Sequence, residues 1–381
     1  MRSGARLAFV VTHPVTAKLL LGRQLEFLKE RGYRVTVVSS PGPVLDEVRE
    51  RHGVDVVAVA MTRGLHLREG PRSFAAMVRA LRRIDPDILN ASTPKAALLA
   101  LTTGRLLRVP HRVYLVRGSF LEVTRGAANA AYLAAEHVMM NSAREVVFVG
   151  ESLRELYVAR GFRRAESAHV IPSNGIDTTR FRPRADMHAA RAATRERLGI
   201  GPDAIVVGFV GRLVADKGVA DLVRAVERLR TRMPGLRLLL VGGDIAGDQL
   251  PASTAEALQR ADYVVQTGVV ADPAPFYAAM DLLAFPSYRE GLPNVALEAA
   301  ACELPVVGYR VTGVRDAIVD GVTGALVDAQ AVDALAAAIA RYSDSSSMRA
   351  LHGEAGRRRV IESFEQRSVW RRWVELYDSF D

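Results

Sequence analysis

The sequence has 381 residues, 49% of them hydrophobic and 24% charged, and its formal net charge is +9. At roughly 150 residues per domain this length predicts two or three domains, and the composition excludes a disordered, collagen-like or coiled-coil chain. The one cysteine, Cys302, excludes an intrachain disulfide and a multi-cysteine metal site, which favours a reducing compartment.

The apolar segments of the sequence are shorter than those of targeting or membrane-spanning helices. The run Leu7–Val11 is too short for a signal peptide and is ended by His13. The nearest approach to a membrane span, residues 127–140, is interrupted by Asn129 and Glu136 and falls short of the roughly 18 to 20 apolar residues required. We therefore expect a cytoplasmic protein that is soluble, or peripheral at the inner face of the membrane.

The first half alternates short apolar runs with longer amphipathic stretches, which is typical of βα units on a parallel sheet. Helices are expected over Leu19–Arg31 and Pro71–Arg83, where apolar residues recur on one face. The expected strands are Arg6–Val11, Arg34–Ser39, Val54–Val59, Ile88–Ala91, Arg112–Val116, Glu145–Val149 and Ala168–Ile171.

Strong turn chemistry at residues 172–175, followed by an irregular polar stretch, marks a domain boundary. We predict a first domain over residues 1–173, a second over 174–362, and a helix over 363–381 that crosses back to the first. Both tryptophans lie in this last segment, and an amphipathic helix so rich in aromatic residues must bury one face.

A second alternation of strands and helices follows the boundary and indicates a second open α/β sheet of similar size. The expected strands are Ala204–Val210, Arg237–Val241, Tyr263–Gln266, Leu282–Ala284, Val306–Gly308 and Gly324–Val327. The expected helices are Gly218–Arg232, Ala255–Ala261, Pro275–Met280, Pro293–Cys302, Val314–Ile318 and Ala331–Tyr342.

The most specific motif is FPSYREGLPNVALE, residues 285–298. Proline suits the first position of a helix, so Pro293 places Glu290 in the preceding loop and Glu298 roughly 7 Å along the helix. Free N–H groups near Asn294 and the positive helix end form an anion site between the two carboxylates. This order suits a sugar hydroxyl, a pyrophosphate and a ribose diol; the alternative is a surface helix with two solvated glutamates.

The second motif is FVGRLVADKG, residues 209–218, in which a strand ends at Gly211 and a helix opens after Lys217. Arg212 and Lys217 can therefore both lie at the carboxyl end of the first strand of the second sheet, where open α/β sheets bind ligands. Two cations aimed at one point match a departing diphosphate; alone, they are more often solvated charges. The turn at Gly243 allows close approach of backbone to a ligand, which is a weak signal.

These motifs, with VIPSNGID at 170–177, the stretch AMDLLAFPSYREGLPNVALEAAACELPVV and GVTGALV at 321–327, resemble the retaining family 4 glycosyltransferases. The resemblance spans essentially the whole length and is stronger over residues 204–330. It implies the α/β fold called GT-B, in which two Rossmann-like domains face a central cleft and a C-terminal helix crosses back to the first.

Carried over position by position, the resemblance implies a role for each matching residue of the second domain. Arg212 and Lys217 would clamp the donor pyrophosphate, Glu290 would contact the donor sugar, and Glu298 would bind the ribose hydroxyls. The phosphates would meet backbone from Gly291 through Leu292 and Pro293 to Asn294, with Gly211 and Gly243 nearby. The family also implies retention of anomeric configuration, with front-face attack in which the leaving phosphate takes the acceptor proton, and closure that excludes water.

The first domain departs from the commonest family pattern. It has THPVTAK where many relatives have a glycine-rich loop, and Arg117 where many have a histidine. With STPK at 92–95, this resembles a polysaccharide- and glycan-assembly branch that often uses UDP donors of hexose or N-acetylhexosamine type. The histidine's role is therefore not carried over to Arg117, which could hold a phosphate instead.

Several further residues are candidates for the acceptor side. Only Lys18, Lys29, Lys95 and Lys217 are lysines, and all but Lys29 follow expected strand ends. We hypothesise that Lys18 or Lys95 binds an anionic group of the acceptor, the alternative being accidental placement. His13 is either a hydrogen-bonding residue of the cleft or a turn residue. Glu122 is either an acceptor-side carboxylate or the ion-pair partner of Arg117.

The sequence indicates neither a metal site nor a cofactor. We find no His, Cys or Asp cluster with metal-ligand spacing and no Asp-x-Asp signature, so cationic side chains would replace the metal and the sugar nucleotide would be a substrate. The expected activity is transfer of a sugar from a nucleotide donor to a hydroxyl of a glycan, lipid-linked or small-molecule acceptor. The alternatives are a sugar-nucleotide epimerase of the same architecture and a non-catalytic nucleotide-binding module.

The net charge of +9 raises the question of anionic partners. Nucleic acid is not expected, because no basic segment with interleaved aromatic residues and no nucleic-acid motif appears. An anionic membrane surface is the better candidate, because acceptors in the resembling branch are often lipid-linked. The candidate contacts are Arg82–Arg83, Arg105–Arg108 and Arg163–Arg164, and the alternative is a set of dispersed, solvated arginines.

Overall fold

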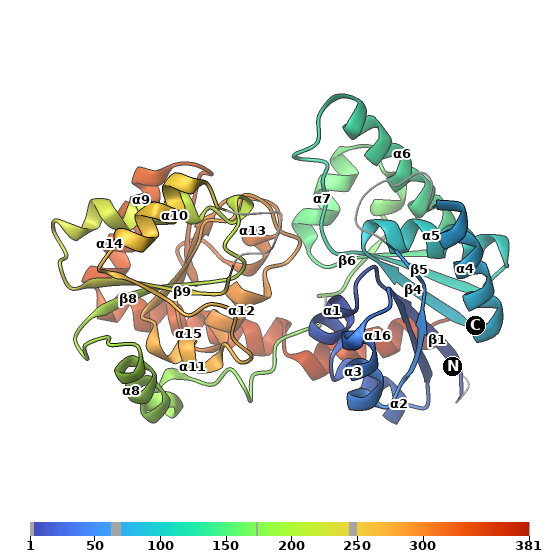
Figure 1. Ribbon diagram of the computed structural model, residues 1–381, viewed down its shortest axis with the longest axis horizontal. Helices are drawn as coiled ribbons and strands as arrows, with labels where there is room; N and C mark the ends of the chain where they lie inside the picture. The colour runs from blue at the N-terminus through green and yellow to red at the C-terminus, as the bar shows by residue number, and fades with distance from the viewer. Residues whose placement is uncertain (1–3, 62–69, 173, 244–249, 381) are drawn as a thin grey trace. The chain divides into compact units, whose positions relative to one another are not determined.

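The computed structural model describes residues 4–61, 70–172, 174–243 and 250–380. The chain divides into two compact units (Figure 1): residues 1–174 together with 367–381, and residues 175–366. Each unit is built on one parallel sheet flanked by helices, which confirms the predicted α/β class. Ser173, where we placed the boundary, lies outside the described residues.

The first unit contains a seven-stranded parallel sheet of order β3-β2-β1-β4-β5-β6-β7. The order reverses direction between β1 and β4, so the carboxyl ends of these two neighbours form a switch point. The strands lie at the predicted places with small shifts at their ends: β1 (Arg6–Val10), β2 (Arg34–Ser39), β3 (Asp55–Ala58), β4 (Ile88–Ser92), β5 (His111–Val116), β6 (Glu145–Phe148) and β7 (His169–Val170).

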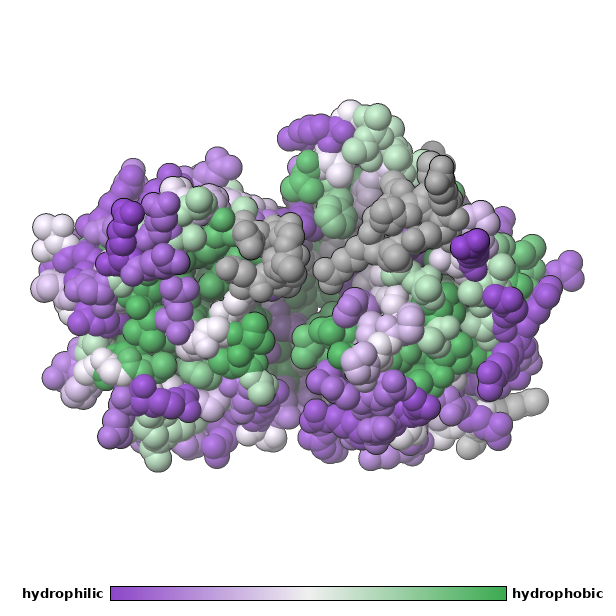
Figure 2. Space-filling view, in the orientation of Figure 1, coloured by the Kyte–Doolittle hydropathy of each residue, from purple (hydrophilic) through white to green (hydrophobic). Residues whose placement is uncertain are grey.

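The helices of the first unit flank this sheet, and all but the C-terminal helix lie between its strands in sequence. They are α1 (Pro14–Thr16), α2 (Gln24–Glu30), α3 (Pro43–His52), α4 (Gly70–Ile84), α5 (Pro94–Leu106), α6 (Gly126–Ser142), α7 (Glu151–Ala159) and α16 (Gln366–Asp378). The prediction of a single helix over residues 19–31 is wrong. Residues 17–21 form a π-helical turn, and Gly22, at φ 43°, separates this turn from α2. Hydrophilic side chains gather over α2 and α3 (Figure 2).

The C-terminal helix α16 packs within the first unit, which confirms that it returns to the first domain. The Trp370 ring lies 5.4 Å from that of Phe27, and Trp373 is buried. The Asn90 side-chain amide, on β4, donates to the Tyr377 hydroxyl at 2.7 Å, and both groups are buried. The aromatic face predicted for this segment is therefore buried against the sheet and helices of residues 1–174.

Replacing Tyr377 with phenylalanine should lower the free energy of unfolding of the first unit by about 1–3 kcal/mol, because the buried Asn90 amide loses its acceptor. Urea unfolding followed by tryptophan fluorescence measures this unit, since both tryptophans lie on α16. Tyr33→Phe is the matched control: its hydroxyl donates to the exposed Asp378 at 2.8 Å, so its loss should cost less. Equal effects of the two variants would contradict the prediction.

The second unit contains a six-stranded parallel sheet of order β10-β9-β8-β11-β12-β13. Its strands are β8 (Ile205–Val210), β9 (Leu236–Val241), β10 (Val264–Gln266), β11 (Leu282–Phe285), β12 (Val306–Tyr309) and β13 (Gly324–Val327). Its helices are α8 (His188–Arg197), α9 (Val219–Arg230), α10 (Ala252–Arg260), α11 (Ala274–Ala279), α12 (Asn294–Ala301), α13 (Val314–Ala317), α14 (Val332–Asp344) and α15 (Ser346–Ser363).

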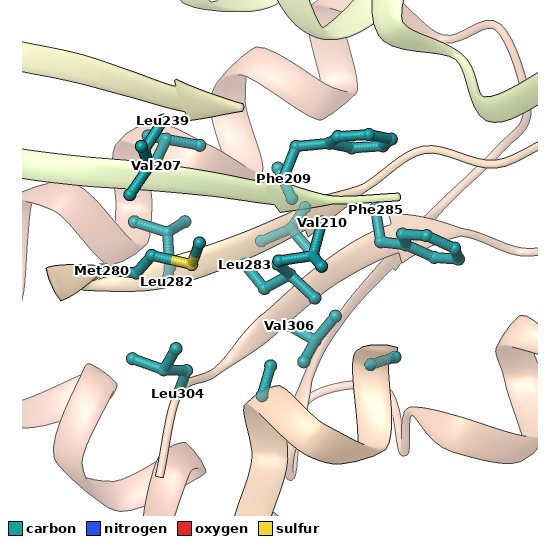
Figure 3. Close-up of a cluster of buried hydrophobic side chains, with 14 of the residues drawn as sticks. Val207, Phe209, Val210, Leu239, Met280, Leu282, Leu283, Phe285, Leu304 and Val306 are labelled. Atoms are coloured by element: carbon teal, nitrogen blue, oxygen red, sulfur yellow. The ribbon is translucent and has the colours of Figure 1, made fainter. Parts of the chain in front are cut away.

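The core of the second unit is centred on β8 and β11 (Figure 3). Phe209 and Phe285, near the carboxyl ends of these strands, stack with ring centroids 6.2 Å apart. Both rings are buried with Leu283 and Val207. This packing fixes the strand ends from which the two sequence motifs continue.

A buried carboxylate joins α8 to the start of the same two strands. Asp281, whose side chain is 3% exposed, pairs with Arg184 at 2.7 Å, Arg191 at 2.9 Å and Arg195 at 2.8 Å. It also accepts from the backbone N–H of Val206 at 2.8 Å. Burial alone would raise the pKa of Asp281, but the neighbouring guanidinium groups hold it below its ordinary value.

The chain enters and leaves the second unit through two segments that lie side by side. The backbone N–H of Ile176 donates to the Phe364 carbonyl at 2.7 Å, and that of Gln366 donates to the Ile176 carbonyl at 3.1 Å. The second unit is therefore a continuous insertion between the two parts of the first.

Candidate active site

The two sequence motifs of the second unit meet at its topological switch point. The strand order reverses between β8 and β11, which are hydrogen-bonded neighbours, with Leu283 in register with Gly208. The chain after β8 carries Arg212 and Lys217, and the chain after β11 carries Glu290. Open α/β sheets bind ligands in the crevice beyond the carboxyl ends of such strands. The structure thus places these three predicted residues at one sheet edge.

Lys217 and Glu290 form an ion pair between the two loops. The Lys217 Nζ lies 2.6 Å from Glu290 Oε1, with side-chain exposures of 12% and 17%. The buried hydroxyl of Ser287 donates to the same carboxylate oxygen at 2.9 Å. The ammonium is therefore held in a fixed place by the carboxylate, and both groups retain some exposure.

Arg212 lies at the end of β8, on a turn whose backbone is bound to the next strand. The N–H of Gly211 donates to the Val241 carbonyl at 2.9 Å, and that of Leu213 donates to the Gly243 carbonyl at 3.1 Å. The Arg212 side chain is exposed. Gly211 and Gly243 thus lie on adjacent turns beside this cation. Asp244, which follows Gly243, lies outside the described residues.

The loop that carries Glu290 is attached to α9 and to the turn before it. The backbone N–H of Tyr288 donates to the Asp216 carbonyl at 2.9 Å, and its hydroxyl donates to the buried Asp221 at 2.6 Å. The Tyr309 hydroxyl donates to the same Asp221 oxygen at 2.7 Å. Burial tends to raise the pKa of Asp221, but these hydroxyl donors hold it below its ordinary value. The Asp221 carboxylate therefore holds the loop that carries Glu290 against α9.

The loop before α12 packs closely against Gly313, and no other residue type fits at that position. Gly313 has φ 79°, and a Cβ there would lie 2.4 Å from the Gly291 carbonyl oxygen. Helix α12 begins at Asn294, and Pro293 precedes it with φ −78° and ψ 101°. Our placement of Pro293 at the first helical position is therefore wrong by one residue, because its extended ψ belongs to a capping residue. The first N–H groups of α12 still lack intrahelical acceptors.

Glu298 lies one turn further along α12, where Tyr277 of α11 contacts it. The Tyr277 hydroxyl donates to Glu298 Oε2 at 2.8 Å. Burial raises the pKa of Glu298, which the Tyr277 hydrogen bond only partly offsets. The carboxylate is thus oriented by a fully buried phenol and is poised to change its protonation state nearer neutrality than an ordinary glutamate.

The acceptor-side candidates of the first unit follow three neighbouring strands. His13 follows β1, Lys95 follows β4 and Arg117 follows β5, so all lie at the carboxyl edge of that sheet. The Arg117 Nε donates to Ser92 Oγ at 3.2 Å, and burial lowers the pKa of Arg117 to about 10. Lys95 is half-buried in the first turn of α5.

The other candidates have local explanations for their positions. The exposed His13 caps α1, with Nδ1 accepting from the Val15 N–H at 3.3 Å. Lys18 pairs with Glu47 of α3 at 2.5 Å. Glu122 is half-buried in the segment between β5 and α6. The turn-residue interpretation of His13 thus has a hydrogen bond to support it, and Lys18 already has an anionic partner.

Four residues that organise this site were not singled out from the sequence: Ser287, Tyr277, Asp221 and Gly313. Ser287 stands three residues before Glu290, and its position inside the PSYREG motif was the available signal. The other three come from α11, α9 and the turn after β12, and their contacts link positions far apart in the chain.

The described residues contain neither a cluster of metal-ligating side chains nor a helix suited to span a membrane. No group of three or more His, Cys, Asp or Glu side chains in this part of the chain could hold a metal ion. Among the helices described, none has the length and apolar character needed to cross a membrane.

Comparisons with known proteins agree with the sequence motifs. Residues 204–345 match the family model described as glycosyl transferases group 1, and residues 21–180 match that described as glycosyltransferase family 4. The capsular polysaccharide biosynthesis glycosyltransferase CapM of Staphylococcus aureus is 29% identical over 98% of this chain and 97% of its own. A GDP-mannose-dependent phosphatidylinositol monomannoside mannosyltransferase of Mycolicibacterium smegmatis is 36% identical, over 62% of each chain.

Solved structures show the same fold. Anabaena HepE, in complex with UDP and glucose, superposes with a TM-score of 0.85 at 21% identity, covering 98% of this chain and 100% of that one. WaaG, a glycosyltransferase of lipopolysaccharide biosynthesis, gives a TM-score of 0.72 at 17% identity, over 98% of each chain. The two family models, the full-length relative and the two-sheet architecture converge, and the chain therefore belongs to the family 4 glycosyltransferases and has the GT-B fold.

Proposed function

We propose that this glycosyltransferase takes a sugar of hexose or N-acetylhexosamine type from a UDP-sugar and retains its anomeric configuration. The observation that carries the proposal is the position of Arg212 and of the Lys217–Glu290 pair at the β8–β11 switch point. Two cations and the N-terminus of α12 there suit a diphosphate leaving group. The UDP and UDP-glucose complexes of Anabaena HepE, a protein of the same fold, support the choice of donor.

In this proposal each part of the donor has a partner in the second unit. Arg212 and Lys217 take the charge that develops on the diphosphate, and the backbone from Gly291 to Asn294 approaches its oxygens. Glu290 accepts from a sugar hydroxyl while it orients Lys217. Glu298 accepts from the ribose hydroxyls. These cations would take the role of a metal, and the sugar nucleotide is a substrate, not a cofactor.

The transfer step exchanges one bond at the anomeric carbon. The acceptor hydroxyl attacks from the face on which the diphosphate leaves, a C–O bond to the acceptor forms as the C–O bond to phosphate breaks, and the hydroxyl proton passes to the leaving phosphate. No side chain needs to act as nucleophile. The cations lower the barrier because their interaction with the phosphate strengthens as its charge grows.

We propose that the first unit holds the acceptor, through Arg117 and Lys95, which follow β5 and β4. The relative CapM is named for capsular polysaccharide biosynthesis and the mycobacterial relative for a phosphatidylinositol mannoside, which supports a glycan or lipid-linked acceptor. A lipid-linked acceptor would bring the protein to the inner face of the membrane as a peripheral protein.

A panel of sugar nucleotides tests this function directly. Tight binding to the folded protein raises its apparent stability by RT ln(1 + [L]/Kd), about 2.7 kcal/mol at a hundredfold excess over Kd. UDP-sugars should raise the melting temperature most, and a transfer assay with the best donor should give product of unchanged anomeric configuration. Greater stabilisation by GDP-sugars would overturn the choice of base, and inverted product would overturn retention.

As the pH is lowered, the affinity for donor should begin to fall at a higher pH than the pKa of an ordinary glutamate would predict. Glu298 accepts from ribose only when ionised, and burial raises its pKa, so protonation begins at higher pH. The KM for donor should therefore rise as pH falls through this raised pKa. In Glu298→Gln the KM should be higher at neutral pH and lose this pH dependence. The measurement is donor KM between pH 5 and 8; an unchanged profile in the variant would assign the dependence elsewhere.

A further inference from the structure

The first unit has a pocket at the edge of its sheet opposite to the acceptor-side candidates. It is about 230 Å³ in volume and is lined by His137, Met140, Asn141, Gly161, Phe162 and Arg164. These residues come from the C-terminal part of α6 and from the segment after α7, which lead into the amino ends of β6 and β7. The His137 and Phe162 rings lie 4.4 Å apart.

Four arginines gather around the end of α6 beside this pocket. Arg105 donates to the Asn141 carbonyl at 2.9 Å, Arg112 to the Ser142 carbonyl at 2.7 Å, and Arg164 to the Arg144 carbonyl at 2.6 Å. Burial lowers the pKa of Arg112, and the charges of Arg144, Arg105 and Arg164 lower it further. These guanidinium groups are thus close enough to repel one another.

Helix capping alone does not account for this charge. The C-terminal ends of α5, α6 and α7 contribute roughly half a negative charge each, about −1.5 in total, against four guanidinium groups. About +2.5 charges therefore remain, and the carboxylate of the adjacent Glu145 reduces this excess to about +1.5. Within the described residues, none of the four pairs with a carboxylate; the nearby Glu145 pairs with His169 at 3.4 Å.

We infer that this pocket binds a phosphate ester. Arg164, His137 and Asn141 present guanidinium, imidazole and amide donors to phosphate oxygens, and Phe162 and Met140 provide an apolar wall for the carbon body. The volume is below the roughly 300–1,000 Å³ of sites for drug-sized ligands, so one phosphate with a small organic group fits better than a nucleotide. The inference does not depend on the proposed transfer reaction.

The phosphate could belong to a soluble ester or to an anionic lipid headgroup. Two of the three arginine sets that the sequence offered as membrane contacts meet here, through Arg105 and Arg164. Exposed apolar side chains adjoin them in sequence: Leu106, 64% exposed, follows Arg105, and Val138, 45% exposed, follows His137. Lipid is the source that would use these apolar side chains.

The test is a titration with inorganic phosphate at constant ionic strength, followed by the NMR signal of the His137 imidazole, which His137→Gln assigns. The signal should shift saturably with phosphate and not with sodium chloride. Arg164→Ala should weaken phosphate binding at least tenfold, because the exposed Arg164 side chain lines the pocket and would contact the phosphate directly. Arg144→Ala should weaken it less, through loss of charge alone.

Arg154→Ala is the matched control, since Arg154 lies on α7 and pairs with Glu151 at 2.5 Å. It should bind phosphate like the wild type. The inference is overturned if Arg164→Ala shifts as the wild type does, or if chloride reproduces the shift. Because His137 reports binding without catalysis, this result stands apart from success or failure of the transfer assay.

Sedimentation with phosphatidylglycerol vesicles, against phosphatidylcholine vesicles, identifies the source. Vesicle binding that is lost in both Arg164→Ala and Leu106→Ser supports the site with lipid as its ligand. A His137 shift without vesicle binding supports the site with a soluble phosphate ester. Vesicle binding that Arg164→Ala leaves intact shows that this pocket does not hold the headgroup and overturns the lipid assignment.

Discussion

Replacing Lys217 with alanine should lower kcat by about 10²–10³-fold, the usual loss when one group that stabilises developing charge is removed. The ammonium is only 12% exposed and is fixed 2.6 Å from Glu290. In the proposed reaction it can therefore act on the leaving phosphate without first having to be ordered or desolvated. In the same proposal, its removal also leaves the Glu290 carboxylate without its cation beside the developing charge of the diphosphate, so the variant adds repulsion to the loss of attraction.

Steady-state kinetics with the best donor of the panel measures this effect. Arg212→Ala should also lower kcat strongly, and Lys217→Arg should fall between alanine and wild type, because it restores the charge without the compact ammonium. Lys29→Ala is the matched control, since Lys29 lies on α2 of the first unit, where it contacts the backbone carbonyl of His52. A kcat for Lys217→Ala within threefold of wild type, with the fold intact by circular dichroism, would refute the diphosphate clamp.

Replacing Asp281 with alanine should destabilise the second unit by roughly 3–5 kcal/mol, the cost of removing one partner from a buried charge cluster. Three guanidinium groups and the Val206 N–H converge on this carboxylate. Without it, Arg195, which is 4% exposed, remains charged and buried beside Arg191. Helix α8 would then lose its attachment to the start of β8 and β11.

Amide hydrogen exchange in β8 and β11 measures this loss, because these are the central strands of the sheet and core strands exchange mainly through global opening. Asp333→Ala is the control: its side chain is 91% exposed and its pairing with Arg228 should contribute less than about 1 kcal/mol. Exchange in Asp281→Ala as slow as in the control would contradict the prediction.

The same carboxylate makes the second unit sensitive to acid. The pKa of Asp281 is lower in the folded protein than its unfolded value of about 3.9, so its contribution is fully present above that pH and is lost as pH falls through the folded pKa. Exchange protection of β8 should therefore decline below about pH 4 in the wild type. In Asp281→Asn the protection should be lower at neutral pH and decline less steeply in acid.

Local patterns were sufficient to predict most strands and the two loops of the candidate site. Strands β2 and β13 have the predicted bounds because runs of apolar and β-branched residues end there in glycine, serine or aspartate. The motifs after β8 and β11 were recognisable because loops at strand ends concentrate charged residues and glycine in short stretches. Placing both motifs at one sheet edge required only the parallel topology.

The elements that the sequence did not predict depend on contacts between distant residues or on weak local patterns. Helix α15 buries few residues, among them Gly353 and Gly356, so its amphipathic signal is slight. A Cβ at Gly353 would lie 2.0 Å from the Glu303 carbonyl oxygen, so the helix packs through its glycines, which usually indicate a loop. The Ser345 side chain, which accepts from the Met348 N–H at 3.2 Å, was the available signal for its start.

The site's supporting residues were unpredictable for a related reason. Asp221 binds Tyr288 across 67 positions of sequence, and Tyr277 binds Glu298 across 21. A single sequence does not show which of such distant residues contact one another. The position of Pro293, wrong by one residue, shows the limit of a local rule: proline fixes φ but leaves ψ free, and here ψ is extended.

The insertion of the second unit between the two parts of the first sets the order in which a ribosome can complete them. Residues 175–366 are continuous, so the second unit can fold as soon as they have emerged. The first unit emerges earlier but lacks α16, whose Trp370 packs on Phe27 and whose Tyr377 receives the Asn90 amide. Until the last helix is synthesised, the nascent first unit exposes the surface around Phe27 and Asn90, against which α16 packs, to solvent and to chaperones. We expect the domain made first to be the one finished last.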